Sequence, residues 1–488
     1  MKKIKLLLAS LVLAAFAFQG CEDMDDNAVP VNDFIWKGLN LYYLWQENVP
    51  NLADNRFADQ GQLNNFLEGY SSPESLFESL LYRKYSDGTN ADRFSVIFSD
   101  FNVLENVLQG VSTSNGVDFQ LVYEDESQSN IFGYVRYILP NTDAANKNIK
   151  RGDIFYAVNG TQLTVSNYQA LLGQTSYTLS LATYVDKTVV PTGETVELTR
   201  AEYAENPVYT TKVVENGSHK IGYLMYNGFY GNYDVDLNNA FGELATAGAN
   251  ELVLDLRYNG GGSVRTATYL ASMITGQFNG QLFAKQQWNA KLQAYYEDKN
   301  PDALLNLFSD KLSNGNTINS LHLNRVYIIA TDATASASEL VINCLKPYID
   351  VILIGETTVG KNVGSVTLYD SPTFSKKDVN GSHRYAMQPI VIRTVNKDGF
   401  GEYSNGITPT IEHKEDLSNL GILGDATEPL FAEAIANITG TGGRTGGRFE
   451  SVKKPKSFKN SKNMRRFGTE MYIDEMPAGS LELVRQLQ

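Results

Sequence analysis

The stretch ATDATASASELVIN, residues 330–343, contains two serines two positions apart, between a strand-like run and a helix-like run. A serine directly before a helix is a candidate nucleophile, which applies to Ser336 and Ser338. The same residues also fit an ordinary helix start, because Ser336-Ala337-Ser338-Glu339 has the capping-box pattern. The local sequence leaves both interpretations open, since a residue at a helix N-terminus can serve in both settings.

The flanking residues predict one βαβ unit, with strands over Arg325–Ala330 and Val351–Gly355 and a helix over Ser336–Leu345. A right-handed crossover between parallel strands places both C-terminal ends at the same edge of the sheet. Ser336 follows the first strand and Lys361 follows the second, so we expect the two side chains to meet. A neutral lysine can act as a base, and burial lowers a lysine pKa because it disfavours the charged form.

A third loop is expected at the same edge. The strand-like run ELVLDL, residues 251–256, ends in RYNGGG before a predicted helix over residues 264–274. Glycines let the backbone approach a ligand closely, and loops at this edge of α/β sheets form ligand sites. A tetrahedral intermediate needs donors for its oxyanion. The backbone N–H groups of Ala337 and of Gly260 or Gly261 are the candidate donors.

These three loops resemble the signature segments of the C-terminal processing peptidases, also called tail-specific proteases. The matching segments are DLRYNGGG (255–262), ASASE (335–339) and GK (360–361), and the resemblance covers roughly residues 90–415. It implies that Ser336 is the nucleophile and Lys361 the general base. The family often has glutamine four residues after the lysine, where this chain has Ser365. An even spacing on an extended segment keeps Lys361 and Ser365 on one face, so we expect Ser365 to hydrogen-bond the amine.

Residues 148–160, NIKRGDIFYAVNG, resemble the core of PDZ domains, in which a strand ends in an Asn-Gly turn. A helix over Val165–Leu172 is predicted where such a domain has its groove helix. PDZ domains capture a peptide end as an added strand. We therefore expect peptide binding at Gly116, Val117, Asp118 and Phe119. A generic small β module is the alternative, because Gly-Asp and Asn-Gly turns also occur in unrelated β domains.

The N-terminus has the charge and length of a secretory signal, with Lys2, Lys3 and Lys5 before an apolar run that ends at Phe18. The following Gln19-Gly20-Cys21 resembles a bacterial lipoprotein signal, which implies that Cys21 carries lipid. The expected location is the cell envelope, anchored to the outer membrane and facing the periplasm or the exterior. An ordinary cleaved signal with an incidental cysteine is the alternative.

The predicted fold class is multidomain α+β. It comprises a helical N-terminal domain, a PDZ-like β module and an α/β catalytic domain of the ClpP/crotonase-like type. The expected boundaries are a signal peptide at 1–20, a tether at 21–30, the helical domain at 31–94, the PDZ-like domain at 95–204, the catalytic domain at 205–437 and a tail at 438–488. From Thr439 the chain reads as a flexible linker and polar extension. Its last stretch, Met471–Leu487, is a candidate for docking as a strand or helix.

The favoured function is a serine endopeptidase that forms an acyl-enzyme at Ser336 and uses no metal or organic cofactor. Its partners would be protein or peptide substrates and, through the lipid, a membrane. A net charge of -14 argues against nucleic-acid binding, which requires a basic face. One alternative is a catalytically inactive peptide- or ligand-binding lipoprotein, and another is a structural scaffold. A histidine triad is not expected, because the four histidines are scattered and no G-x-S-x-G elbow occurs.

Overall fold

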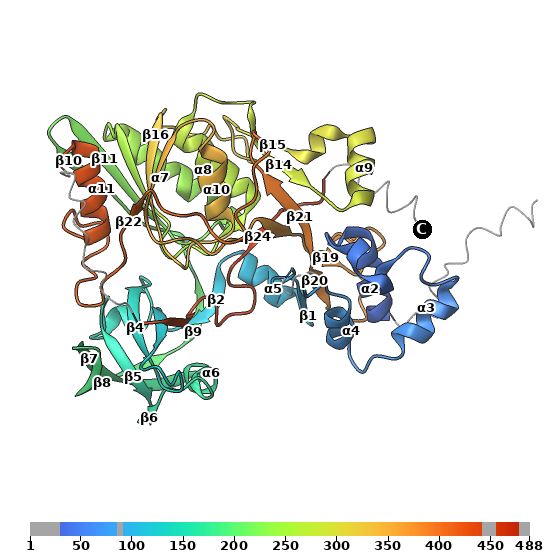
Figure 1. Cartoon of the computed structure of the whole chain (residues 1–488), viewed down its shortest axis with the longest axis horizontal. Coiled ribbons are helices and arrows are strands. Elements are labelled where there is room, and N and C mark those ends of the chain that lie inside the picture. The colour runs from blue at the N-terminus through green and yellow to red at the C-terminus, as the bar shows by residue number, and fades with distance from the viewer. Residues whose placement is uncertain (1–29, 85–90, 442–454, 478–488) are drawn as a thin grey trace, which may run out of the picture.

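The computed structural model describes residues 30–84, 91–441 and 455–477 (Figure 1). The N-terminal part is helical, as predicted for residues 31–94, and Phe34, Tyr42 and Tyr43 are buried in it. Ser72 caps one helix by accepting a hydrogen bond from the Ser75 N–H, with Pro73 in the first turn. The elements are α2 (Pro30–Tyr42), α3 (Gln60–Leu67) and α4 (Pro73–Ser79), with 3₁₀ turns at Gln46–Asn48 and Pro50–Leu52.

A short connection leads into a β module, the cyan and teal part at the lower left of Figure 1. Its main sheet has the order β23-β3-β4-β5-β7-β8, with β6 beside β5. The connection comprises β1 (Val96–Phe98) and α5 (Phe101–Leu108). The module comprises β2 (Val111–Ser114), β3 (Val117–Tyr123), β4 (Ile131–Ile138), β5 (Ile154–Val158), β6 (Thr161–Gln162), α6 (Tyr168–Leu172), β7 (Ser176–Val185), β8 (Thr188–Thr199) and β9 (Ala201–Ala204), with a 3₁₀ turn at Ala144–Asn146.

Two local predictions in this module have different outcomes. The Asn-Gly turn is confirmed, since Asn159 and Gly160 both have positive φ between the paired strands β5 and β6. The helix predicted from Val165 starts only at Tyr168. Asn167 and Thr164 bond each other's backbone N–H groups, and such local bonds favour a turn over a helix.

The α/β domain expected at residues 205–437 is built on a six-stranded sheet of order β10-β11-β12-β16-β17-β22. The strands from β11 to β22 are parallel, and β10 is antiparallel at one edge. The predicted βαβ unit and its parallel neighbour β12 are therefore confirmed. The strands are β10 (Val208–Asn216), β11 (His219–Tyr226), β12 (Glu251–Asp255), β16 (Arg325–Ala330), β17 (Asp350–Gly355) and β22 (Ile411–Glu412).

Helices cover both faces of this sheet, which explains why its strands are apolar on both sides. Successive residues of β16, such as Ile328 and Ile329, point to opposite faces of the sheet and belong to different apolar clusters. Helix α11 covers one face, and α7, α8 and α10 lie on the other (Figure 1). The helices are α7 (Asp234–Thr246), α8 (Val264–Thr275), α10 (Ala337–Leu345) and α11 (Pro429–Thr439), with a 3₁₀ turn at Gly231–Tyr233.

Two further sheets join the domain to its neighbours. One has the order β13-β24-β18-β21-β14-β15, and a three-stranded sheet β1-β20-β19 contacts the N-terminal part. Their elements are β13 (Gly262–Ser263), β14 (Leu282–Gln287), α9 (Ala290–Lys299), β15 (Leu305–Leu307), β18 (Val363–Ser365), β19 (Leu368–Tyr369), β20 (Ala386–Gln388) and β21 (Ile390–Val395), with a 3₁₀ turn at Pro301–Leu304.

The tail differs from the flexible linker that its composition predicts. Residues 455–477 pack against the rest of the chain and contribute β23 (Ser457–Asn460) and β24 (Met471–Tyr472). The linker interpretation is wrong for residues 455–470, because backbone pairing with β3 fixes the path of β23. The expectation that the stretch from Met471 docks as a strand is confirmed at β24, where Met471 is buried. Within residues 30–84, 91–441 and 455–477, no helix is long and apolar enough to cross a membrane.

Candidate active site

Ser336 lies at the C-terminal edge of the sheet, between β16 and α10. Its backbone φ is 65°, in the left-handed region that non-glycine residues rarely adopt. The side chain is fully buried, and its Oγ has no hydrogen-bond partner within the part of the chain that the structure describes. Backbone strain at a buried hydroxyl is more typical of a functional residue than of a residue that only caps a helix.

Glu339 connects the Ser336 loop to the Lys361 loop. One carboxylate oxygen accepts hydrogen bonds from the N–H groups of Ser336 (2.7 Å) and Lys361 (2.8 Å). The other accepts from the Gly360 N–H (2.6 Å) and the Thr358 hydroxyl. Burial raises the pKa of Glu339, although these donors oppose the shift. The residue that the sequence suggested as a cap therefore also joins the two loops that carry the predicted dyad.

Lys361 is fully buried, and its amine lies 4.3 Å from the centre of the Phe94 ring. Its Nζ donates to the Thr469 carbonyl (2.9 Å) and forms an ion pair with Glu470. Burial lowers the pKa of Lys361, and the Glu470 carboxylate opposes this shift. Among the described residues, no hydrogen bond joins the lysine amine to the Ser336 hydroxyl, and the amine bonds residues of the tail instead.

The loop of residues 257–262, called here the triglycine loop, lies against Ser336, as predicted. Gly261 has φ +109°, and a Cβ there would lie 2.6 Å from the Ser336 Cβ and 2.9 Å from the Ala337 nitrogen. Only glycine fits so close an approach. The Gly261 N–H donates to the Asn259 side chain (2.9 Å). Among the three predicted oxyanion donors, Gly260 and Ala337 are therefore better candidates than Gly261.

Buried polar contacts hold the triglycine loop in place. Arg257 is fully buried and bonds Asp255 and Glu428 (2.7 and 2.6 Å between charged atoms), and Glu415 lies 3.2 Å away. Arg151 of the β module also pairs with Glu415, at 2.7 Å. This network fixes the start of the loop and connects it to the β module.

The remaining predicted site residues lie at two places. Ser365 is buried and donates to the Met471 carbonyl (3.3 Å), so the expected bond to the lysine amine is not present. Gly116 precedes β3, and Val117, Asp118 and Phe119 form its first residues. Asp118 is buried in an ion pair with Arg136 (2.5 Å). Cys21 lies outside the described residues.

Sequence reasoning missed three residues around the lysine: Phe94, Asp92 and Glu470. Asp92 and Glu470 both favour the charged amine, and burial raises the pKa of Glu470 to about 7. Glu470 lies 109 residues from Lys361 in the chain. No local pattern marks it, because an ion pair between distant segments depends on the fold.

Comparison with known proteins gives the same family for two parts of the chain. The model of peptidase family S41 matches residues 220–413, and the model of the S41 N-terminal domain matches residues 30–96. The chain is 27% identical over 229 residues to a carboxyl-terminal-processing protease of Picosynechococcus, covering 46% of this chain and 50% of that protein. It is 27% identical over 219 residues to the chloroplastic carboxyl-terminal-processing peptidase 1 of Arabidopsis thaliana, covering 44% and 41%.

A solved structure extends this similarity over most of the fold. An S41 protease from Bacteroides fragilis is 27% identical, with a TM-score of 0.64, and the match covers 84% of this chain and 97% of that one. The chain spans about half the length of the curated relatives it matches. The mixed, multidomain helix and sheet organisation predicted from the sequence is confirmed. Carboxyl-terminal-processing proteases are among the relatives of this chain. Together with the three loops that meet at Ser336, the two family matches show that the chain belongs to peptidase family S41.

Proposed function

We propose that the protein is a serine endopeptidase that cleaves peptide bonds through an acyl-enzyme at Ser336, with Lys361 as general base. One observation carries the proposal: the Glu339 carboxylate binds the backbone of both residues at once. This arrangement holds a buried, unpartnered hydroxyl and a buried amine on adjoining loops. Family membership and the names of the relatives support the same reaction.

In the proposed reaction, the Ser336 Oγ attacks the substrate carbonyl carbon while its proton passes to the neutral Lys361 amine. The N–H groups of Ala337 and Gly260 would stabilise the oxyanion, assisted by the N-terminus of α10. The C–N bond then breaks, and the protonated lysine returns the proton to the leaving amine. Water hydrolyses the acyl-enzyme by the same route, which restores the serine. Burial supports this role of Lys361, since it lowers the lysine pKa toward the working range.

We further propose that the β module acts as a PDZ-like domain that takes the C-terminal end of a protein substrate as a strand beside β3. The strand that starts after Gly116 supports this role, because its edge can accept an added strand. The proposal includes a lipid on Cys21 and a location in the cell envelope, both of which derive from the N-terminal sequence.

Cleavage of an unfolded reporter protein by residues 22–488, combined with labelling by a fluorophosphonate probe, tests this function. Ser336→Ala and Lys361→Ala are each expected to lose activity roughly 1000-fold or more while remaining folded. The Ser338 hydroxyl donates to the Asn259 carbonyl and is not the proposed nucleophile, so the Ser338→Ala chain should still be labelled. Lys220→Ala, at an exposed lysine, is the control for charge removal. Covalent labelling of the Ser336→Ala chain would contradict the assignment of the nucleophile.

A noncatalytic peptide-binding role is the second candidate. It is favoured by one observation, that the Lys361 amine is paired with Glu470 rather than with Ser336. A binder predicts no labelling of Ser336, even in variants that lack the Glu470 carboxylate. It also predicts peptide affinities that Ser336→Ala leaves unchanged.

A further inference from the structure

The tail between residues 456 and 474, called here the tail segment, first occupies the edge of the β module. Strand β23 pairs antiparallel with β3, and the Tyr123 N–H donates to the Lys456 carbonyl (3.0 Å). Phe458 packs on the module core, with its ring 5.1 Å from that of Tyr168 on α6. The tail segment therefore takes the place that the proposed function assigns to a substrate strand.

The tail segment then crosses from the module to the catalytic edge. The Ser461 hydroxyl donates to Asp118 (2.8 Å), the buried acid near the start of β3. The buried Lys462 amine donates to the carbonyls of Asn227 (2.7 Å) and Tyr258 (3.1 Å). These contacts direct the backbone along the triglycine loop. A substrate whose C-terminal end bound beside the start of β3 would end at this point. The tail segment instead continues toward Ser336.

At the site, the backbone of the tail segment lies over Gly260, a proposed oxyanion donor, and over the neighbouring Gly261. A Cβ on Gly260 would lie 2.7 Å from the Gly468 carbonyl oxygen, and one on Gly261 would lie 2.2 Å from that of Glu470. Strand β24 then runs parallel to both β13 and β18. Figure 1 shows β24 in the middle of the molecule, between the catalytic domain and the N-terminal helices.

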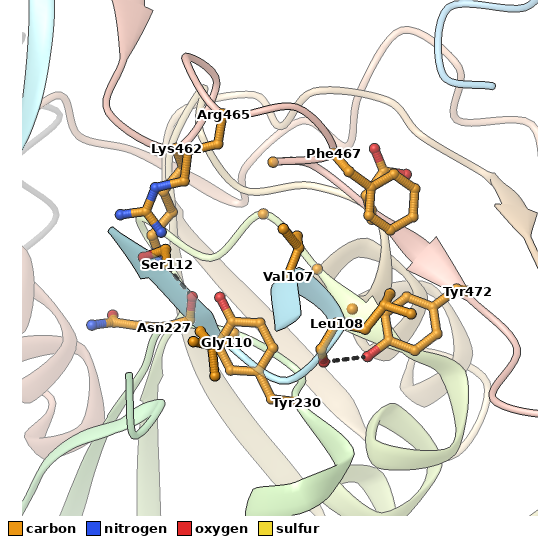
Figure 2. A pocket seen from close by; sticks show the side chains of 17 residues that line it. Val107, Leu108, Gly110, Ser112, Asn227, Tyr230, Lys462, Arg465, Phe467 and Tyr472 are labelled. Atoms are coloured by element: carbon orange, nitrogen blue, oxygen red, sulfur yellow. Dashed lines mark hydrogen bonds between the residues drawn. The ribbon is translucent and has the colours of Figure 1, made fainter. Parts of the chain in front are cut away.

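The tail segment leaves little room for another peptide. The cavity beside the triglycine loop has a volume of about 60 Å³, whereas ligand pockets typically have about 300–1,000 Å³. Figure 2 shows Lys462, Arg465, Phe467 and Tyr472 of the tail segment around this cavity, facing Val107, Leu108 and Gly110. A hydrogen bond from the Tyr472 hydroxyl to the Leu108 carbonyl (3.1 Å) joins the two sides.

We propose that the tail segment is a built-in inhibitor that blocks the β3 edge and the catalytic groove together. Its Glu470 carboxylate also keeps the Lys361 amine in the charged form, which cannot act as a base. This inference rests on the proposed peptidase function. A carboxylate beside the amine stabilises its charged form, and a charged lysine cannot accept the serine proton. A protein substrate would have to displace the tail segment before it could reach Ser336.

The contacts indicate an inhibitor rather than a substrate caught before cleavage. The Ser336 Oγ has no hydrogen bond to the lysine or to any other described residue. The lysine amine is bound to the Thr469 carbonyl and Glu470, so the base faces the tail segment and not the nucleophile. Catalysis requires the nucleophile to bond its base.

The test compares full mature chains that carry Glu470→Gln or Glu470→Lys with the wild type. Glu475→Gln is the matched control, because Glu475 is an exposed carboxylate five residues further along. Fluorophosphonate labelling of Ser336 should be roughly tenfold faster or more in both Glu470 variants, since each unit of lysine pKa changes the neutral fraction about tenfold. The Glu475→Gln chain should match the wild type. Glu470→Gln is close in shape to the native residue, so it keeps the test valid if Glu470→Lys fails to fold.

Hydrogen exchange of residues 456–474, measured in a Ser336→Ala background, reports release of the tail segment without relying on activity. Faster exchange in Glu470→Lys, together with faster labelling in the active chains, would support the inhibitor. Equal labelling of the Glu470 variants and the Glu475→Gln chain would overturn it, as would an intact mass showing that the wild type cuts its own Glu470–Met471 bond. If no variant is labelled although hydrogen exchange shows that the tail segment is released, the proposed peptidase function is wrong. The inhibitor proposal is then wrong as well, because it depends on that function.

Discussion

At the scale of single residues, Glu339 shows how one buried carboxylate can organise a site. It accepts three backbone N–H bonds and one hydroxyl bond from two loops. A buried donor left without its acceptor costs about 1–3 kcal/mol, so this acid contributes to stability as well as to the geometry of the site.

We predict that Glu339→Ala lowers the rate of Ser336 labelling by roughly 100-fold, because the two loops lose their shared acceptor and small misplacements are costly. Urea unfolding should show a loss of about 2–4 kcal/mol, from several unsatisfied donors. Glu243→Ala, at an exposed site on α7, is the control. Glu339→Gln keeps one acceptor oxygen but has no charge. If it restores the labelling rate, Glu339 acts by positioning the loops, and if it does not, the negative charge itself is required.

The second residue-scale prediction concerns pH. Labelling requires the neutral amine of Lys361, so its rate rises as pH increases through the lysine pKa. The carboxylates of Glu470, Asp92 and Glu339 all raise this pKa, while burial lowers it. Removing the Glu470 charge therefore lowers the lysine pKa, and the labelling curve of Glu470→Gln should shift to lower pH. The measurement is the labelling rate against pH for both chains. A midpoint that stays unchanged or rises would contradict the assigned ion pair.

At the scale of elements, β23 covers the edge of the β module, which would otherwise expose unpaired backbone groups of β3. Its side chains alternate as a strand requires: Phe458 packs on the module core and Lys459 is exposed. The contact therefore combines backbone pairing with one aromatic anchor.

Phe458→Ala should weaken the contact of β23 with the module by about 1–2 kcal/mol, which is less than the full burial of a phenylalanine because the ring is only half-buried. Hydrogen exchange of β23 and of β3 should become faster together. Lys459→Ala, on the exposed side of the same strand, should leave both rates unchanged. Faster exchange in β23 alone would mean that β3 keeps its protection without the added strand.

At the scale of the whole molecule, the Arg257 network holds separate parts of the chain together. Arg257 pairs with Asp255 at the end of β12 and with Glu428 at the start of α11. Arg151 brings in the β module through Glu415, and the Tyr258 hydroxyl also bonds Glu415. The site thus depends on charges contributed by widely separated segments.

Arg257→Ala is expected to destabilise the protein by about 3–5 kcal/mol, since it leaves buried carboxylates without their partner. Lys220→Ala removes an exposed ion pair with Glu215 and should cost less than about 1 kcal/mol. Urea unfolding of both variants at neutral pH measures the difference. Similar losses in the two variants would mean that Arg257 is not energetically central.

Sequence patterns predicted the parts of the fold that depend on short-range chemistry. The strand of RVYIIA, the helix after Ser336 and the strand of VILIG follow from apolar runs and a helix start within 31 residues. The handedness of the crossover then places Ser336 and the loop of Lys361 at one edge. Motif resemblance added the family.

The sequence by itself therefore determined the elements and the edge that they share, because periodicity and chain chirality act locally. The motif resemblance added which residues are the candidate nucleophile and base. The tertiary structure decided which groups those residues contact: Glu470 on the Lys361 amine, Met471 on Ser365 and β23 on β3. These partners lie more than 100 residues apart, and most of the pairing uses backbone atoms. Backbone pairing has no side-chain signature, so the residues of β23, whose composition reads as a linker, can form a strand on the β module.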